Sequence, residues 1–176
     1  MRRFLPTVAV VIVLAATAAA CVPQSEPAQN GQLPDTSLTT VTPSCRVAND
    51  VADPLQQLMY FSLITGTFVQ PETQSYVAPA LPQPPRNESC YRSLEMQQWW
   101  RNLYCFLGDC GMAAVPGTSV HGWGRAVDFE DANGELTFGS AGYAWLQANA
   151  WRFGFVHPAW AEPGGSSPEP WHWEHP

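Results

Sequence analysis

The sequence contains no lysine, and charged residues of any kind are scarce. Only 13% of the 176 residues are charged, and all eight basic side chains are arginine. Arg2 and Arg3 lie at the N-terminus, so the rest of the chain carries six arginines against 15 acidic residues, a net charge of −9. Such a negative field repels nucleic acid and anionic lipid, so a polyanionic partner is excluded. The sequence also lacks internal repeats, which argues against a repeat architecture.

Hydrophobic residues, in contrast, are plentiful. They make up 45% of the chain, and eight of them are tryptophan. This composition excludes disorder for the main body and is sufficient for a buried core. The length predicts one domain with appendages, and we expect a monomer.

The first 20 residues have the pattern of a secretory signal. The two arginines precede an uncharged apolar run from Phe4 to Ala20, which ends in the small residues ATAAA. The run has 17 residues, at the lower limit of a membrane span, so an uncleaved anchor stays an alternative. Cys21 follows at once, in a context that resembles the bacterial lipoprotein box. We expect an exported cell-envelope protein, attached to the membrane only through Cys21 or otherwise secreted.

The cysteines support export. If Cys21 carries lipid, four cysteines are left, and an exported protein can pair all four. We predict one disulfide, Cys105–Cys110, that closes a small loop after a helix. A second, Cys45–Cys90, then fastens the N-terminal part of the domain.

Composition and periodicity divide the chain into a signal peptide (1–20), a flexible tether (21–44) and a folded domain (45–176). The tether is rich in Pro, Ser, Thr and Gln. In the domain, patterns with start and stop residues predict helices that begin near Asn49 or Asp53, at Ser93 and at Ser140. Alternation predicts strands over 124–130, 153–157 and 171–175, with a turn at Asn133-Gly134. The mixture indicates an α+β fold with a small antiparallel sheet.

Candidate metal ligands lie in two segments. In the stretch SVHGWGRAVDFE, His121 and Asp128 are surrounded by small residues that leave room for an ion and a substrate. Zinc accepts imidazole nitrogen and carboxylate oxygen, and a catalytic site needs three protein ligands. The tail segment EPWHW offers His172 as a third ligand, with Glu169 just before it as a candidate base.

The same segments resemble zinc D,D-carboxypeptidases of the VanY type. SVHGWGRAVDFE is similar to their SxHxxGxAxD motif, and EPWHW to their ExxH motif. Upstream, YRSLEMQ is similar to their YRSxxxQ segment, and WLQANAWRFGFV to the helix and strand between the zinc motifs. The four segments occur in the family's order over roughly residues 88–174. The resemblance implies a hedgehog/DD-peptidase-like fold.

The resemblance also implies a role for each matching residue. One zinc ion per chain is expected, held by His121, Asp128 and His172. Glu169 matches the general base, and Arg92 matches the arginine that contacts the substrate and stabilises the oxyanion. The remaining matches are polar positions of the substrate subsite: Ser119, Ser93 and Gln97.

The implied reaction is removal of the terminal D-alanine from a peptidoglycan stem peptide that ends in D-Ala-D-Ala. An endopeptidase with the same ligands is the nearest alternative, and a non-catalytic zinc module that binds the cell wall is another. Rival residues also remain at the site. His175 is a second tail histidine, Glu174 a second candidate base, and Arg125 a second candidate cation.

Overall fold

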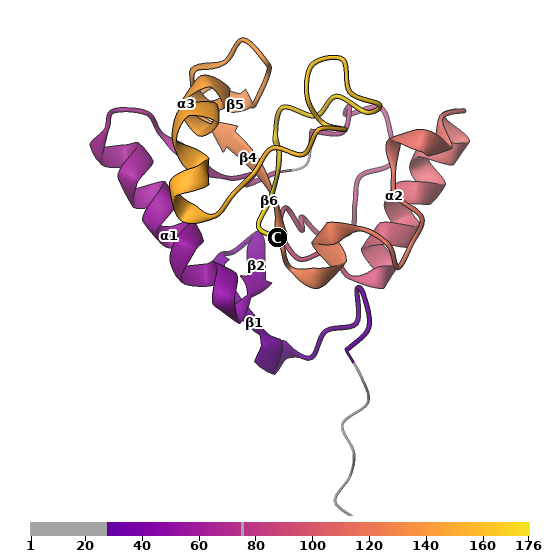
Figure 1. Cartoon of the computed structure of the whole chain (residues 1–176). Helices are drawn as coiled ribbons and strands as arrows, with labels where there is room; N and C mark the ends of the chain where they lie inside the picture. Colours follow the sequence, from indigo (N-terminus) through magenta and orange to yellow (C-terminus); the bar gives the residue numbers. More distant parts are fainter. Residues whose placement is uncertain (1–27, 75) are drawn as a thin grey trace, which may run out of the picture.

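The computed structural model describes residues 28–74 and 76–176 (Figure 1). The signal peptide and Cys21 lie outside the described residues. The elements follow in this order: η1 (Asp35–Ser37), β1 (Leu38–Thr42), β2 (Cys45–Ala48), α1 (Asn49–Ile64), β3 (Val69–Pro71), α2 (Leu94–Phe106), η2 (Cys110–Met112), η3 (Val120–Trp123), β4 (Ala126–Asp131), β5 (Gly134–Glu135), α3 (Ala141–Asn149), η4 (Ala150–Phe153) and β6 (His172–Glu174). The fold is α+β, as predicted. No helix of the described part is long and apolar enough to cross a membrane.

Strand β4 is the centre of the larger sheet. It pairs antiparallel with β3, with β5 across the predicted Asn133-Gly134 turn, and with β6. All six residues of β4 are buried. Val127 and Phe129 belong to the hydrophobic core, whereas Asp128 lines a cavity. The alternation in the sequence therefore separates the core face of this strand from its functional face.

Helices lie on both sides of this sheet. In Figure 1, α1 and α3 stand together on one side of β4 and β6, and α2 stands on the other. Helix α1 buries Val51, Leu55 and Leu58 on one stripe. Its Phe61 packs against Trp145 of α3, with ring centroids 5.9 Å apart. The apolar core thus fills the α1–α3 side of the sheet and leaves the α2 side for the cavity.

The helix ends follow the predicted local signals. Ser93 and Ser140 cap α2 and α3, and each hydroxyl accepts from a backbone N–H three residues on. Gly154, with a φ of 78°, ends the helical segment that α3 and η4 form. The predicted strand over 153–157 is reduced to one bridge, between Val156 and Glu174.

Part of the predicted tether is folded. Residues 38–42 form β1 and pair with β2, and Asn30 is buried with 7% exposure. Its side-chain amide donates to the carbonyl of Ser119 and accepts from Gln97. The folded domain therefore includes Asn30 and residues 38–42 of the segment predicted as a tether, because these residues bond to the rest of the domain.

Both predicted disulfides are present, Cys45–Cys90 and Cys105–Cys110. The first lies in a densely bonded stretch. Ser89 donates from its backbone N–H to Ser44, and Tyr91 donates to Arg46. Residues 89–91 are thereby fixed against the start of β2, immediately before the predicted functional Arg92.

Candidate metal centre

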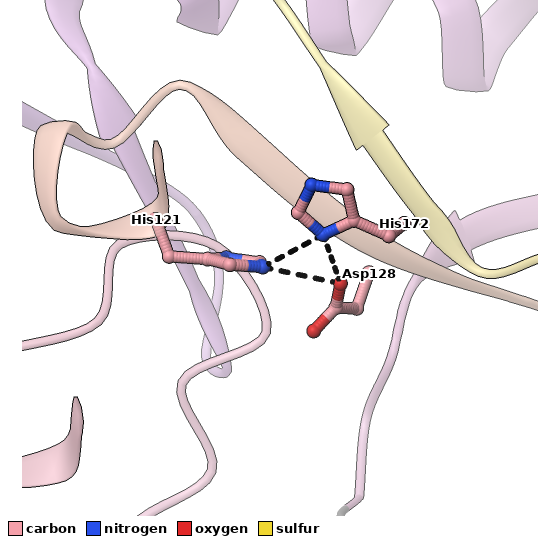
Figure 2. A group of neighbouring side chains, drawn as sticks. All are labelled: His121, Asp128 and His172. Carbon is pink, nitrogen blue, oxygen red and sulfur yellow. Dashed lines mark hydrogen bonds and ion pairs between the residues drawn. The ribbon is translucent and has the colours of Figure 1, made fainter. Parts of the chain in front are cut away.

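Three side chains far apart in sequence meet beside β4. His121 belongs to η3, Asp128 lies in the middle of β4, and His172 begins β6. The register pairs Asp128 directly with His172, which places their side chains on the same face of the sheet. All three residues are at most 7% exposed. Figure 2 shows the two imidazole rings and the carboxylate pointing toward one another.

The glycine beside His121 allows this turn to pack closely. A Cβ atom on Gly122 would lie 1.9 Å from the Asn30 side-chain oxygen and 2.5 Å from the Gln97 amide nitrogen. The position therefore excludes any larger residue. The chain reaches the site through a tight η3 turn that the N-terminal segment and α2 support from behind.

The three ligand atoms form an almost equilateral triangle. His121 Nε2 lies 3.1 Å from His172 Nδ1, and Asp128 Oδ1 lies 3.2 Å from each nitrogen. Three ligands of a tetrahedral zinc ion, each at about 2.0–2.1 Å, lie about 3.3–3.4 Å from one another. The observed triangle is close to one face of that tetrahedron.

The outer partners of the two histidines leave one ring nitrogen of each free to bind an ion. His121 Nδ1 lies 2.7 Å from the carbonyl oxygen of Cys90, which only accepts, so Nδ1 carries the proton and Nε2 keeps its lone pair. Likewise, His172 Nε2 lies 3.1 Å from a carboxylate oxygen of Glu174. When His172 is neutral with its proton on Nε2, two lone pairs and a carboxylate oxygen face one another. A cation satisfies all three.

Without a metal ion, the pKa values of the two histidines are shifted in opposite directions. Burial, and after it the Arg92 charge, lower the pKa of His121 to about 4. Burial also disfavours charge on His172, but its hydrogen bonds to Asp128 and Glu174 outweigh burial and raise its pKa to about 9. Without an ion, His121 is therefore neutral and His172 is protonated, and the His172 proton lies between the ring nitrogen and the Asp128 carboxylate.

Arg92 lies at the edge of this group. It precedes the Ser93 cap of α2, and its Nη2 donates to the second oxygen of Asp128 at 2.8 Å. Its Nε–H is buried and has no partner among the described residues. The guanidinium also lies 5.7 Å from the centre of the Trp100 ring. Arg92 thus holds a ligand carboxylate and keeps one donor unused.

Glu169 is positioned by a turn. The backbone N–H of His172 donates to the carbonyl of Glu169 at 3.2 Å, with Pro170 at the first corner. The spacing of the ExxH segment is therefore the length of one β-turn, which presents both side chains at the cavity. Burial raises the pKa of the Glu169 carboxyl from 4.5 to about 7, a value suited to a base near neutral pH.

A cavity of about 500 Å³ surrounds these groups. Of the predicted subsite residues, Ser119 and Gln97 line it. Gln97, however, is fully engaged, since its amide bonds to Asn30, to the carbonyl of Arg92 and to the N–H of Gly117. Ser93 lies outside the lining residues. The structure gives it the role of helix cap instead.

The rival residues have other partners. The His175 ring lies against Gly154 and Phe155, outside the ligand group. Glu174 contacts the outer nitrogen of His172, so it orients a ligand. Arg125 forms an ion pair with Asp50 at the surface, away from the metal group.

Sequence reasoning missed Glu72 and gave Glu174 only the role of a rival base. Glu174 lies two residues after His172, and strand alternation could have placed both on one face. Glu72 had no signal at all. It follows β3, its N–H donates to the carbonyl of Asp128, and its side chain lines the cavity. Burial, and then the charge of Asp128, raise the pKa of Glu72 to about 10.

Comparisons with known proteins agree with this geometry. Residues 85–175 match the family described as VanY, D-alanyl-D-alanine carboxypeptidase. A D-alanyl-D-alanine carboxypeptidase from Enterococcus faecalis (strain ATCC 700802 / V583) is 46% identical over 65 residues, which are 35% of this chain. That match spans only 24% of the relative's length.

Solved structures extend the similarity to most of the chain. VanYB in complex with D-alanine-D-alanine is 27% identical, with a TM-score of 0.58 over 78% of this chain and 76% of that one. A zinc-bound mutant of the D,D-pentapeptidase VanY from a VanB-type vancomycin resistance cassette is 26% identical, with a TM-score of 0.58 over 81% and 82%. The L,D-carboxypeptidase LdcB, 20% identical with a TM-score of 0.60 over 82% and 70%, shares the fold.

Proposed function

Because the chain belongs to the VanY family of D-alanyl-D-alanine carboxypeptidases, we propose that it is a zinc-dependent peptidase that removes the last residue of peptides ending in D-Ala-D-Ala. One observation carries the proposal. Two imidazole lone pairs and a carboxylate oxygen converge within 3.2 Å of one another, beside a cavity of about 500 Å³. When bound, zinc supplies a Lewis acid that polarises a peptide carbonyl and makes water more acidic.

Glu169 is the base in this proposal. It lines the same cavity as the ligands, and the hydroxyl of Ser167 donates to its Oε1 at 3.2 Å. That hydrogen bond orients the carboxylate, and a pKa of about 7 lets it accept a proton from water and return the proton to the leaving amine.

Arg92 is the residue for the substrate carboxylate or the developing oxyanion. Its guanidinium lines the cavity, and the planar group suits an oxygen pair better than an ammonium does. The cavity is otherwise acidic, since its lining residues include five glutamates and no basic side chain other than Arg92 and the two ligand histidines. Among the described residues that line the cavity, Arg92 is therefore the cation available to a substrate carboxylate.

The natural substrate in this proposal is the peptidoglycan stem peptide, reached after export. Two disulfides within 28–176 support an oxidising compartment, and binding of D-Ala-D-Ala by the VanYB structure supports the peptide end. Attachment through lipid on Cys21 completes the proposal. Labelling with a fatty-acid analogue, with Cys21→Ser as the control, tests that attachment.

The activity is tested with the purified protein and an acetylated peptide ending in L-Lys-D-Ala-D-Ala. We expect release of D-alanine that stops with a chelator and returns with zinc. Glu169→Gln should retain zinc and lower kcat by at least about a hundredfold, the low end for a lost general base.

Two further peptides separate the alternatives. A peptide ending in L-Ala should resist cleavage, and an amidated D-Ala end should be a poor substrate if Arg92 binds the carboxylate. Equal cleavage of amidated and free-acid peptides would refute the carboxypeptidase and favour the endopeptidase. Zinc binding without cleavage of any of these peptides would favour the non-catalytic module.

A further inference from the structure

A third buried histidine, His157, lies behind the site, and neither the ligand group nor the proposed reaction uses it. Its side chain is 2% exposed. The sequence places it at the end of the segment FGFVH, before Pro158. Its ring nitrogen Nε2 lies 2.9 Å from the carbonyl oxygen of Glu169. Because a carbonyl only accepts, Nε2 carries a proton and donates it to the main chain of the proposed base.

The Glu169 carbonyl therefore receives two hydrogen bonds. One comes from the His172 backbone N–H and closes the turn, and the other comes from His157. The N–H of Glu169 is also fixed, since it donates to the carbonyl of Ala161 at 2.9 Å. His157 thus donates a hydrogen bond to Glu169, the first residue of the turn. The same turn contains both the proposed base and the metal ligand His172.

His157 is itself held on all sides. Its ring packs against Trp173 at 4.8 Å and Tyr143 at 5.4 Å between centroids. Its second nitrogen, Nδ1, lies 3.1 Å from a carboxylate oxygen of Glu162, without the alignment of a hydrogen bond. Glu162 in turn accepts from the Tyr143 hydroxyl and the Gln147 amide. A connected set of contacts therefore runs from α3 through Glu162 and His157 to the Glu169 turn.

We propose that His157 is a positioning residue for the base. It acts through the main chain of Glu169 and fixes where the Glu169 carboxylate stands relative to the ligand triangle. The proposal rests on the function proposed above, in which Glu169 is the base. A ring held by packing is suited to this task, because it cannot follow the turn if the turn moves.

The test compares two substitutions of zinc-loaded full-length protein. His157→Phe keeps a ring against Trp173 and Tyr143 but removes the donor, whereas His157→Gln places an amide N–H near the former Nε2. We expect His157→Phe to lower kcat roughly tenfold or more, since small displacements of a catalytic group are costly, with KM within about twofold. His157→Gln should recover at least about a third of the wild-type kcat, because it restores the hydrogen bond.

A matched control and an activity-independent readout complete the design. His175→Phe alters another ring histidine of the same region, and kcat should stay within about twofold of wild type because that ring does not face the turn. Hydrogen exchange of the His172 amide, which closes the turn, should be faster in His157→Phe than in wild type and His157→Gln.

The possible results separate this inference from the proposed function. If the wild type cleaves the peptide but His157→Phe matches it in kcat and amide exchange, the inference is overturned. It is also overturned if Phe and Gln lower kcat equally with the same loss of thermal stability, since the role is then structural. If the wild type does not cleave the peptide, the proposed function fails. In that case unchanged His172 exchange in His157→Phe also overturns the positioning role, and faster exchange in that variant alone supports it.

Discussion

The buried carboxyl of Glu72 makes the stability of the metal-free protein depend on pH. Glu72 is 9% exposed, lies beside Asp128, and has no side-chain hydrogen bond within the described residues. Its pKa is about 10 in the folded protein, against 4.5 for a free glutamate. Between these values the folded chain keeps a proton that the unfolded chain has released. Stability therefore falls as pH rises through this window, by about 1.4 kcal/mol per pH unit.

Replacing Glu72 with Gln removes this dependence. The amide has nearly the same shape and no charge to bury. The pH of 7 lies 2.5 units above the pKa of 4.5 that the carboxyl has in the unfolded chain. Each unit costs the wild type about 1.4 kcal/mol of stability, so Glu72→Gln should stabilise the metal-free protein by about 3 kcal/mol. The gain over wild type should shrink to nearly zero at pH 4.5. Zinc should also reduce the gain, because a dication beside Asp128 favours the Glu72 carboxylate.

Urea unfolding followed by tryptophan fluorescence, with chelator at pH 4.5, 5.5, 6.5 and 7.5, measures the difference. Glu95→Gln is the control, since Glu95 is an exposed carboxyl whose side chain is 72% accessible, and its effect should stay below about 1 kcal/mol at every pH. The reasoning is refuted if Glu72→Gln shows the same difference from wild type at all four values, or if it destabilises the protein at pH 7.5.

Three further predictions concern the site. Alanine at His121, Asp128 or His172 should abolish zinc binding, measured by metal analysis after dialysis, whereas His175→Ala should keep one zinc; the reverse result for His172 and His175 would show that the ligand is the other histidine. Arg92→Lys should lower kcat/KM for the free-acid peptide about tenfold or more with normal zinc content, because a lysine loses the planar fork; unchanged kinetics would remove Arg92 from the reaction. Serine at Cys45 and Cys90 should cost about 4 kcal/mol and serine at Cys105 and Cys110 about 2 kcal/mol in chemical unfolding, since the loops span 45 and 5 residues. Only the replacement of Cys45 and Cys90 should also weaken zinc binding, because the Cys90 carbonyl orients His121. Equal zinc affinity in the two double variants would contradict this link between the disulfide and the metal site.

The helices were predictable because their signals are local. Ser93 and Ser140 cap helices whose apolar spacing is visible in the sequence, and Gly154 stops the last of them. The short strands were not. Strand β3 has three residues and gains its hydrogen bonds from β4, some 60 residues later, so nothing within its own segment marks it.

At the site, too, some residues were predictable from the sequence and others were not. The resemblance of two segments to zinc-peptidase motifs predicted His121, Asp128 and His172, which the structure brings together. The groups that orient these ligands could not be predicted from the sequence, because they are main-chain atoms and side chains distant in the sequence. Any residue type at position 90 could supply the carbonyl that His121 needs. Ser93 was expected to contact substrate, yet the helix start uses its hydroxyl.

If Cys21 carries lipid, the folded N-terminal segment limits the distance between the catalytic domain and the membrane. With a tether that ends at residue 44, a lipid on Cys21 would allow a reach of about 80 Å in a fully extended chain. Asn30 is already buried in the folded part, so the chain between Cys21 and that residue spans at most about 30 Å. An enzyme attached in this way would serve only the layer of cell wall next to the bilayer.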